Sequence, residues 1–131
     1  MKIYQIHDDI YNHHFCIITD ISCPDLKKYI NKKFPGGKLE VDDGTQGLYF
    51  YTTKDDIKYY FLWLPKFNWT IKEQAILSHE LIHHLTNAFE TKNIKMSDDN
   101  TEVMAYYWEY IFKKVWTALQ PKHHKYKKKK K

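Results

Sequence analysis

The sequence predicts an α+β fold in which a mostly antiparallel sheet packs against two long helices. Short segments rich in β-branched and aromatic residues dominate the first half of the chain, and two stretches with apolar residues at helical spacing dominate the second. Strands first and helices last is the order typical of this class. With 131 residues, 43% of them hydrophobic, the chain is long enough for one domain with its own core.

The first third of the chain predicts two strands and one helix. Residues 2–6 and 14–19 carry the apolar, β-branched and aromatic side chains that favour strands. A helix over residues 25–34 follows Ser22, with a proline in its first turn, and the Pro-Gly-Gly at 35–37 ends it.

The middle of the chain predicts a β-hairpin. The turn-forming residues 42–47 precede a strand over 48–53, and the polar residues 54–56 connect it to a second strand over 57–64. Pro65 ends that strand, because proline cannot donate to a sheet ladder.

Two helices are predicted in the second half. Thr70 and Glu73 have the spacing of a capping box, and apolar residues then recur every three or four positions as far as Phe89. Residues 97–100 offer several cap candidates for the last helix, whose apolar stripe ends near Gln120.

Charge divides the chain into a domain and a tail. All 21 basic residues are lysines and seven lie within 122–131, so the rest of the chain has 14 lysines against 16 acidic residues. Residues 1–120 are therefore expected to form a slightly acidic domain, and residues 121–131 a lysine-rich tail. The tail is expected either to be solvated or to attract a polyanion, such as a nucleic acid, or a virion partner.

Composition excludes several protein classes. The aromatic content of 17% excludes disorder for most of the chain. The longest uncharged apolar run, residues 59–65, is far shorter than the roughly 20 residues that span a membrane, and no basic-apolar leader opens the chain. Cys16 and Cys23 are too few for a disulfide framework. We therefore expect a cytoplasmic protein, and the lysine-only composition hints at a phage, either in its host or in the virion.

The candidate catalytic motif is His79-Glu80-x-x-His83, within the predicted helix that follows Thr70. Because four residues make about one helical turn, the two imidazoles point the same way and can bind one Zn²⁺. Glu80 lies beside the pair and can take a proton from a zinc-bound water, whose pKa the metal lowers to about 7. The alternative is a polar helix face without a metal.

A catalytic zinc needs a third protein ligand. A three-histidine site would need glycine and histidine three and six residues after His83, where this chain has Thr86 and Phe89, so that class is excluded. Glu102 lies in the first turn of the last helix, and a hairpin of the two helices would bring it over the pair. The non-metal explanation for Glu102 is a carboxylate favoured by the helix N-terminus. The alternative ligands are Asp98 and Asp99.

Other polar residues carry weaker signals. Tyr106, one turn beyond Glu102, is expected either to donate to a developing oxyanion or simply to pack. Glu109 on the same side is a candidate for orienting a ligand histidine. His84 points about 100° away from His83 and is expected beside the site or on the surface. A group near the start of the chain indicates either a polar strand end or a second metal site: His7, Asp8, Asp9, His13 and His14.

The histidine motif with a glutamate on the next helix resembles the gluzincins, the thermolysin-like zinc peptidases. The stretches 76–80 and 100–106, with a Glu-x-x-Ala-Tyr segment after the histidine helix, resemble small zincin-like proteins encoded by phages and prophages. The resemblance covers residues 57–116. It implies a small zincin-like domain, hydrolysis of peptide bonds, and a peptide substrate lying along an edge strand at 57–64.

The sequence thus predicts a zinc peptidase in which His79, His83 and Glu102 bind the metal, while Glu80 and Tyr106 are catalytic. Glu80 is expected to act as general base and then as general acid to the leaving amine. Two alternatives stay open. One is a phage virion or assembly component that keeps a zincin-like fold with a structural metal or none. The other is a nucleic-acid-binding accessory protein that acts through the tail, which the acidic domain disfavours.

Overall fold

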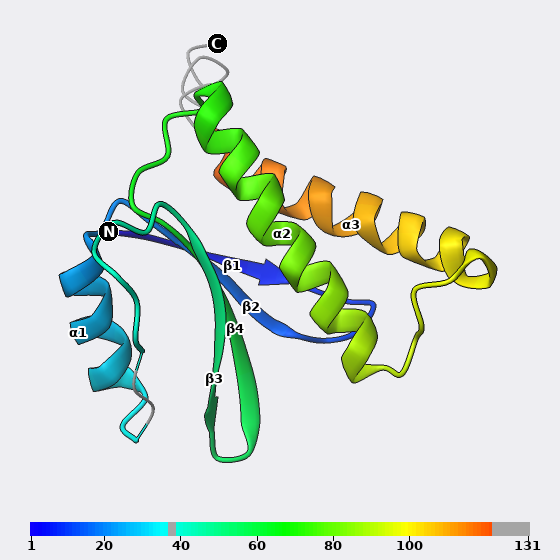
Figure 1. Cartoon of the computed structure of the whole chain (residues 1–131), viewed down its shortest axis with the longest axis horizontal. Helices are drawn as coiled ribbons and strands as arrows, with labels where there is room; N and C mark the ends of the chain where they lie inside the picture. The colour runs from blue at the N-terminus through cyan, green and yellow to red at the C-terminus, as the bar shows by residue number, and fades with distance from the viewer. Residues whose placement is uncertain (37–38, 122–131) are drawn as a thin grey trace, which may run out of the picture.

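Four strands form one mixed sheet in the order β1-β2-β4-β3, with three helices around it (Figure 1). The computed structural model describes residues 1–36 and 39–121, so the predicted tail partner at 122–131 lies outside the described residues. The predicted α+β class is confirmed. The elements are β1 (Lys2–His7), β2 (His14–Thr19), α1 (Cys23–Lys33), β3 (Leu48–Lys54), β4 (Ile57–Leu64), α2 (Ile71–Thr91), a short 3-10 turn (Asp98–Asn100) and α3 (Thr101–Leu119).

The pairing of β4 corrects one expectation from the sequence. β4 pairs antiparallel with β3 on one side and parallel with β2 on the other, so its backbone groups are used on both sides. The prediction that residues 57–64 form an edge strand is therefore wrong. The physical reason is burial on both faces: the last five residues of β4 are all buried, the continuous pattern of an interior strand. The outer strands of the described sheet are β1 and β3.

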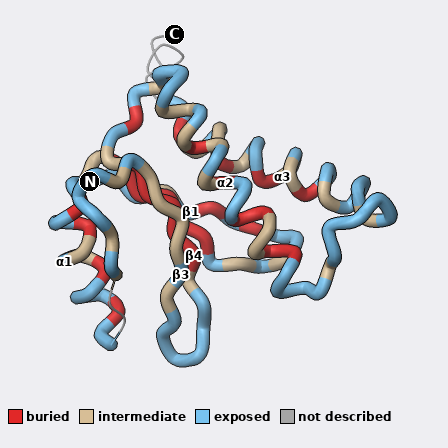
Figure 2. The backbone as a smooth tube through the Cα atoms, in the orientation of Figure 1, coloured by how far each residue is buried: buried red, intermediate tan, exposed pale blue. Residues whose placement is uncertain are grey.

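The sheet separates two apolar layers. Side chains alternate across each strand, so Phe15 and Ile17 of β2 pack toward α2 and α3, whereas Cys16 and Ile18 pack toward α1. Figure 2 shows the buried residues gathered where the strands meet the helices. The layer beneath α2 and α3 is the larger one, and it is the layer that borders the functional residues described below.

Two further expectations concern the cysteines and the membrane. Cys16 and Cys23 are both free and buried, in agreement with two reduced thiols. No helix within residues 1–36 and 39–121 combines the length and the apolar character needed to cross a membrane.

Gly47 sets how closely the start of β3 approaches α2. A Cβ atom at Gly47 would lie 2.5 Å from Cγ2 of Ile76 and 3.6 Å from Cγ of Glu80. The branched side chain of Ile76 has little freedom to move away. Glycine therefore allows the contact between this edge of the sheet and the helix that carries the histidine motif.

We expect Gly47→Ala to lower the free energy of unfolding by about 1–3 kcal/mol, because the added methyl overpacks the β3–α2 contact. Urea denaturation of the two proteins measures the difference. Gly44→Ala is the matched control, because nothing lies within 4 Å of a Cβ atom at Gly44. Equal destabilisation by both substitutions would contradict the proposed role of Gly47.

Candidate functional site

α2 has one face in the core and one face in solvent. The capping box predicted for its start is confirmed, since the Thr70 hydroxyl accepts from the backbone N–H of Glu73 and the Glu73 carboxylate accepts from the backbone N–H of Thr70. The face turned to the sheet buries Leu77, Leu81, His84, Leu85, Ala88 and Phe89. The opposite face therefore presents the remaining histidines of the motif to solvent.

His79 and His83 lie together on this exposed face. Their ring centroids are 5.1 Å apart and the rings are nearly perpendicular, at 78°. The His79 side chain is 69% exposed, so both water and a metal ion can reach the pair. The one-turn spacing in the sequence thus brings the two imidazoles together, as predicted.

Glu80 connects the histidine pair to the sheet. Its Oε2 lies 3.8 Å from Nε2 of His79, and its Oε1 accepts a hydrogen bond of 2.9 Å from the backbone N–H of Tyr49 in β3. The Glu80 side chain is only 12% exposed. The carboxylate is consequently held in place beside the imidazoles, where the sequence predicts a general base.

The same hydrogen bond reveals the orientation of β3. In an antiparallel ladder, alternate residues turn both backbone groups toward the partner strand or away from it. Since the N–H of Tyr49 points away from β4 and toward Glu80, the backbone groups of Tyr51 also point outward. No described strand covers this side of β3, so it is the free edge that lies next to the motif.

A groove of about 530 Å³ runs between this free edge and α2. Glu80 and His83 line its helix side, and Tyr49 and Tyr51 line its strand side. The groove therefore combines two residues of the histidine motif with backbone groups that can pair with an extended chain.

The residues predicted from α3 lie elsewhere. Figure 1 shows the first turn of α3 beyond the C-terminal end of α2, away from the middle of that helix. Glu102 is exposed there, and within residues 1–36 and 39–121 no group of three ligand side chains within 4.8 Å of one another contains it. The Tyr106 side chain is 68% exposed. Glu109 forms an ion pair of 3.0 Å with Lys113 and is also exposed.

The orientation of α3 explains this arrangement. Tyr107, Ile111, Val115 and Leu119 occupy its buried face. This phase turns Glu102 and Tyr106 to solvent. The alternative ligands Asp98 and Asp99 lie in the exposed 3-10 turn before the helix. The structure thus brings together His79, His83 and Glu80 but not Glu102 or Tyr106, whose metal and catalytic roles stay predictions.

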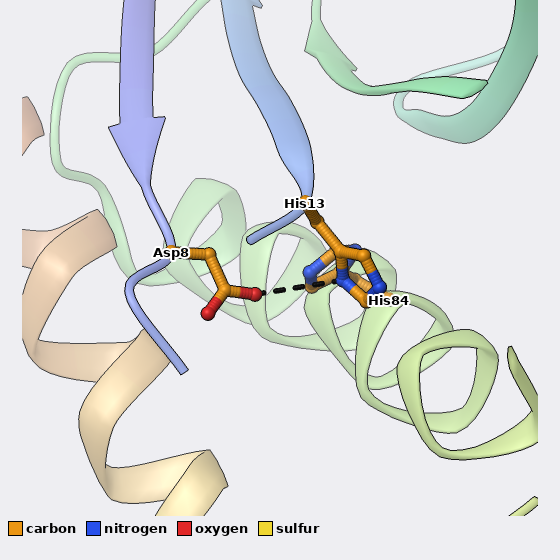
Figure 3. Close-up of side chains that lie close together, drawn as sticks. All are labelled: Asp8, His13 and His84. Atoms are coloured by element: carbon orange, nitrogen blue, oxygen red, sulfur yellow. Dashed lines mark ion pairs between the residues drawn. The ribbon is translucent and has the colours of Figure 1, made fainter. Parts of the chain in front are cut away.

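A second polar cluster is buried between the sheet and α2. Asp8 follows β1, His13 precedes β2 and His84 comes from the core side of α2, and the three side chains point toward one another (Figure 3). One ligand atom from each residue lies within 4.8 Å of the other two, so the group could hold a metal ion. Asp8 is 3% exposed and His84 is fully buried. The sequence marked Asp8 and His13 as members of either a polar strand end or a second metal site, and it did not include His84 in that group.

Asp8 is held by several donors. Its Oδ1 accepts hydrogen bonds from the backbone N–H groups of Ile10 and Tyr11, at 3.0 and 2.9 Å. Its Oδ2 accepts one of 2.8 Å from the Tyr107 hydroxyl and lies 3.5 Å from Nδ1 of His13. This carboxylate therefore joins the β1–β2 connection to α3.

His84 continues the same network toward β3. Burial, with a smaller effect from His13, lowers the pKa of His84 to about 3, so its ring is neutral near pH 7. Because the Tyr107 hydroxyl donates to Asp8, Nε2 of His84 donates to the Tyr107 oxygen at 3.3 Å. Nδ1 then accepts from the Tyr49 hydroxyl at 2.8 Å. Each nitrogen of the His84 ring has one partner. His84 was expected either beside the site or on the surface, and its full burial shows that the surface alternative is wrong.

Comparison with known proteins found no relative of this chain. The chain matches no family model, no curated protein and no solved structure. The assignment of a function therefore depends on the two sites themselves: an exposed histidine pair beside a free strand edge, and a buried group of one aspartate and two histidines.

Proposed function

We propose that this protein is a zinc-dependent hydrolase that cleaves peptide bonds in the groove between α2 and β3. The observation that supports the proposal best is the hydrogen bond of 2.9 Å between Glu80 and the β3 backbone. It keeps a carboxylate beside His79, at 3.8 Å, and next to a strand edge that is free to pair. The general base, one histidine of the metal-binding pair and a peptide-binding edge thus line one groove, and the other histidine, His79, lies beside Glu80.

The donor set of the groove fits a catalytic zinc in part. His79 and His83 supply two imidazoles at one-turn spacing, which is the arrangement that zinc hydrolases use on a helix. Because Glu102 is exposed in the first turn of α3, away from this pair, the proposed site does not use it as the third ligand. When bound, zinc supplies a water of lowered pKa. With zinc held by His79 and His83, Glu80 would accept a proton from the attacking water and would then donate it to the leaving amine.

The substrate that fits the groove is an extended polypeptide. The N–H of Tyr49 is already bonded to Glu80, so the C=O of Tyr49 and the N–H and C=O of Tyr51 are the outward groups of β3 that can pair with one added strand. Alternate side chains of the bound peptide would then face the groove. Because β4 is paired on both sides, β3 replaces residues 57–64 as the proposed docking strand. A folded protein would have to open locally before it could pair in this way.

We expect hydrolysis of unfolded casein to stop when zinc is removed with a chelator and to return when zinc is added back. The His83→Ala protein should not regain hydrolysis when zinc is added back, because one imidazole alone holds the metal too weakly. Glu102→Gln should leave zinc affinity and activity unchanged, since its side chain is exposed in the first turn of α3, and Figure 1 shows that turn beyond the C-terminal end of α2. Zinc titration and a peptide-release assay measure both quantities.

Two results would overturn parts of this proposal. Hydrolysis that persists in the chelated protein would exclude the zinc mechanism. A loss of zinc in Glu102→Gln as large as that in His83→Ala would mean that the first turn of α3 lies over the histidine pair in the metal-bound protein. Asp98→Asn is the matched control, because Asp98 is an exposed carboxylate just before the same helix.

A second candidate is a non-catalytic component, such as a phage virion or assembly protein, with a structural metal. The observation that favours it is the completeness of the buried group, which has three ligand side chains where the exposed pair has two. In that case zinc would raise the thermal stability of the protein, but neither the wild type nor any groove variant would hydrolyse casein.

A further inference from the structure

We propose that Asp8, His13 and His84 form a buried structural zinc site that ties the β1–β2 connection to α2. This site is separate from the exposed histidine pair, His79 and His83, and does not depend on the proposed hydrolase. It draws its ligands from three places far apart in the sequence: the end of β1, the start of β2 and the core face of α2 (Figure 3).

The spacing of the ligand atoms is close to what zinc requires. Bonds of about 2.0–2.1 Å in tetrahedral geometry place neighbouring ligand atoms roughly 3.3 Å apart. Nδ1 of His13 and Oδ2 of Asp8 are 3.5 Å apart. The nitrogen of His84 completes a triangle in which no side exceeds 4.8 Å. A side-chain movement on the order of 1 Å therefore closes the site.

His13 provides independent evidence for a ligand. Among the buried side-chain nitrogen and oxygen atoms of the described residues, Nδ1 of His13 is the one without a hydrogen-bond partner. Its side chain is only 10% exposed, so water does not readily compensate. A buried polar atom without a hydrogen bond is unfavourable, and the nearest acceptor, Oδ2 of Asp8, lies 3.5 Å away. A metal ion bound to this nitrogen would use its lone pair.

The ligand types indicate which metal the site would take. Two imidazoles and one carboxylate suit zinc, and equally cobalt as its spectroscopic substitute, whereas calcium and magnesium prefer oxygen ligands only. The Tyr107 hydroxyl borders the group, at 2.8 Å from Asp8 and 3.3 Å from His84.

The surroundings already resemble the outer shell of a metal site. The backbone N–H groups of Ile10 and Tyr11 orient the Asp8 carboxylate. Tyr49 contacts Nδ1 of His84. With a metal on Nε2 the ring would take the other tautomer, so that Nδ1 would donate to the Tyr49 oxygen and the bond from Nε2 to Tyr107 would be lost. Phe15 stacks on the His84 ring with centroids 4.0 Å apart. Because aromatic packing covers the group, its role is structural rather than catalytic.

The experiment uses the full chain carrying His79→Ala and His83→Ala, which removes the exposed pair. After chelation and dialysis, calorimetric titration with Zn²⁺ should find about one tight site per chain, and Co²⁺ should give the strong visible absorption of a tetrahedral complex. Adding His13→Asn should weaken binding by at least about 100-fold. His14→Asn is the matched control, since His14 is the exposed neighbour of His13.

A measurement without substitutions guards against variants that fail to fold. In histidine-labelled wild-type protein, zinc should shift the side-chain nitrogen signals of His13 and His84 but leave those of His14 in place. The proposal is overturned if the His79→Ala/His83→Ala protein binds no zinc, or if His13→Asn binds as tightly as His14→Asn. Loss of hydrolysis in the same proteins has no bearing on this result, so the two proposals fail separately.

Discussion

Glu80→Gln is expected to reduce hydrolysis of unfolded casein by about 10²–10⁴-fold while leaving the zinc content unchanged. Glutamine keeps the size of the side chain, and its amide oxygen can still accept the hydrogen bond from the backbone N–H of Tyr49. What it loses is the ability to take a proton from water. The effect should therefore appear in kcat, measured at saturating casein, with little change in protein stability.

Two comparisons separate catalysis by Glu80 from its structural role. Glu90→Gln changes another glutamate of the same groove that lies away from the histidine pair, and it should be nearly silent. Glu80→Ala removes the hydrogen bond to Tyr49 as well, so it should lower both activity and the free energy of unfolding. If Glu80→Gln hydrolyses casein at the wild-type rate, the proposed mechanism is wrong.

In metal-free protein, stability is expected to fall steeply as the pH drops below 6.5. Burial lowers the pKa of His84 from 6.5 to about 3. Between these values the unfolded chain binds a proton that the folded chain does not, so the free energy of unfolding decreases with falling pH. The free energy of unfolding keeps its full value, as far as His84 is concerned, above pH 6.5. Below pH 6.5 it falls by up to about 1.4 kcal/mol for each pH unit, down to about pH 3.

Urea denaturation with a chelator at several pH values between 7.5 and 4.5 measures this slope. His13 acts in the same direction, because burial lowers its pKa too. His14→Asn should keep the wild-type slope, whereas His84→Gln should flatten it. A stability that is constant from pH 6.5 to 4.5 would contradict a buried neutral His84.

Local patterns predicted the helix that carries the motif. The spacing of Leu77, Leu81 and Leu85 correctly assigned its buried face, and the Thr70 capping box correctly assigned its start. Both features depend on neighbours within one or two helical turns. For the same reason the side-by-side placement of His79 and His83 was predictable.

Contacts between distant segments were not predictable in this way. The parallel pairing of β2 with β4 joins strands separated by α1 and β3, and no local pattern encodes it. Where Glu102 lies depends on the connection between α2 and α3 and on which face of α3 is buried. Spacing along the chain limits how far apart two residues can lie, but it does not tell which face of a helix packs against the core.

The buried cluster of Asp8, His13 and His84 combines a local relation, which the sequence reveals, with a contact between distant segments, which it does not. Asp8 and His13 are close in sequence and could be paired from it, but His84 reaches them only through the packing of α2 on the sheet. One local signal was present: His84 follows Leu81 by three positions and precedes Ala88 by four, so it falls on the apolar stripe of the helix. A histidine on a core-facing stripe indicates a buried polar partner, since burial without one is costly.

The free edge of β3 has a consequence for self-association. An uncovered strand edge can template the addition of another copy and so begin aggregation. Here Glu80 occupies the backbone N–H of Tyr49, and Nζ of Lys58 lies 4.9 Å from the centre of the Tyr51 ring. A strand that adds along this edge therefore meets one donor that is already used and a carboxylate beside it. This shortens the ladder that a second copy could form and disfavours the growth of an extended intermolecular sheet.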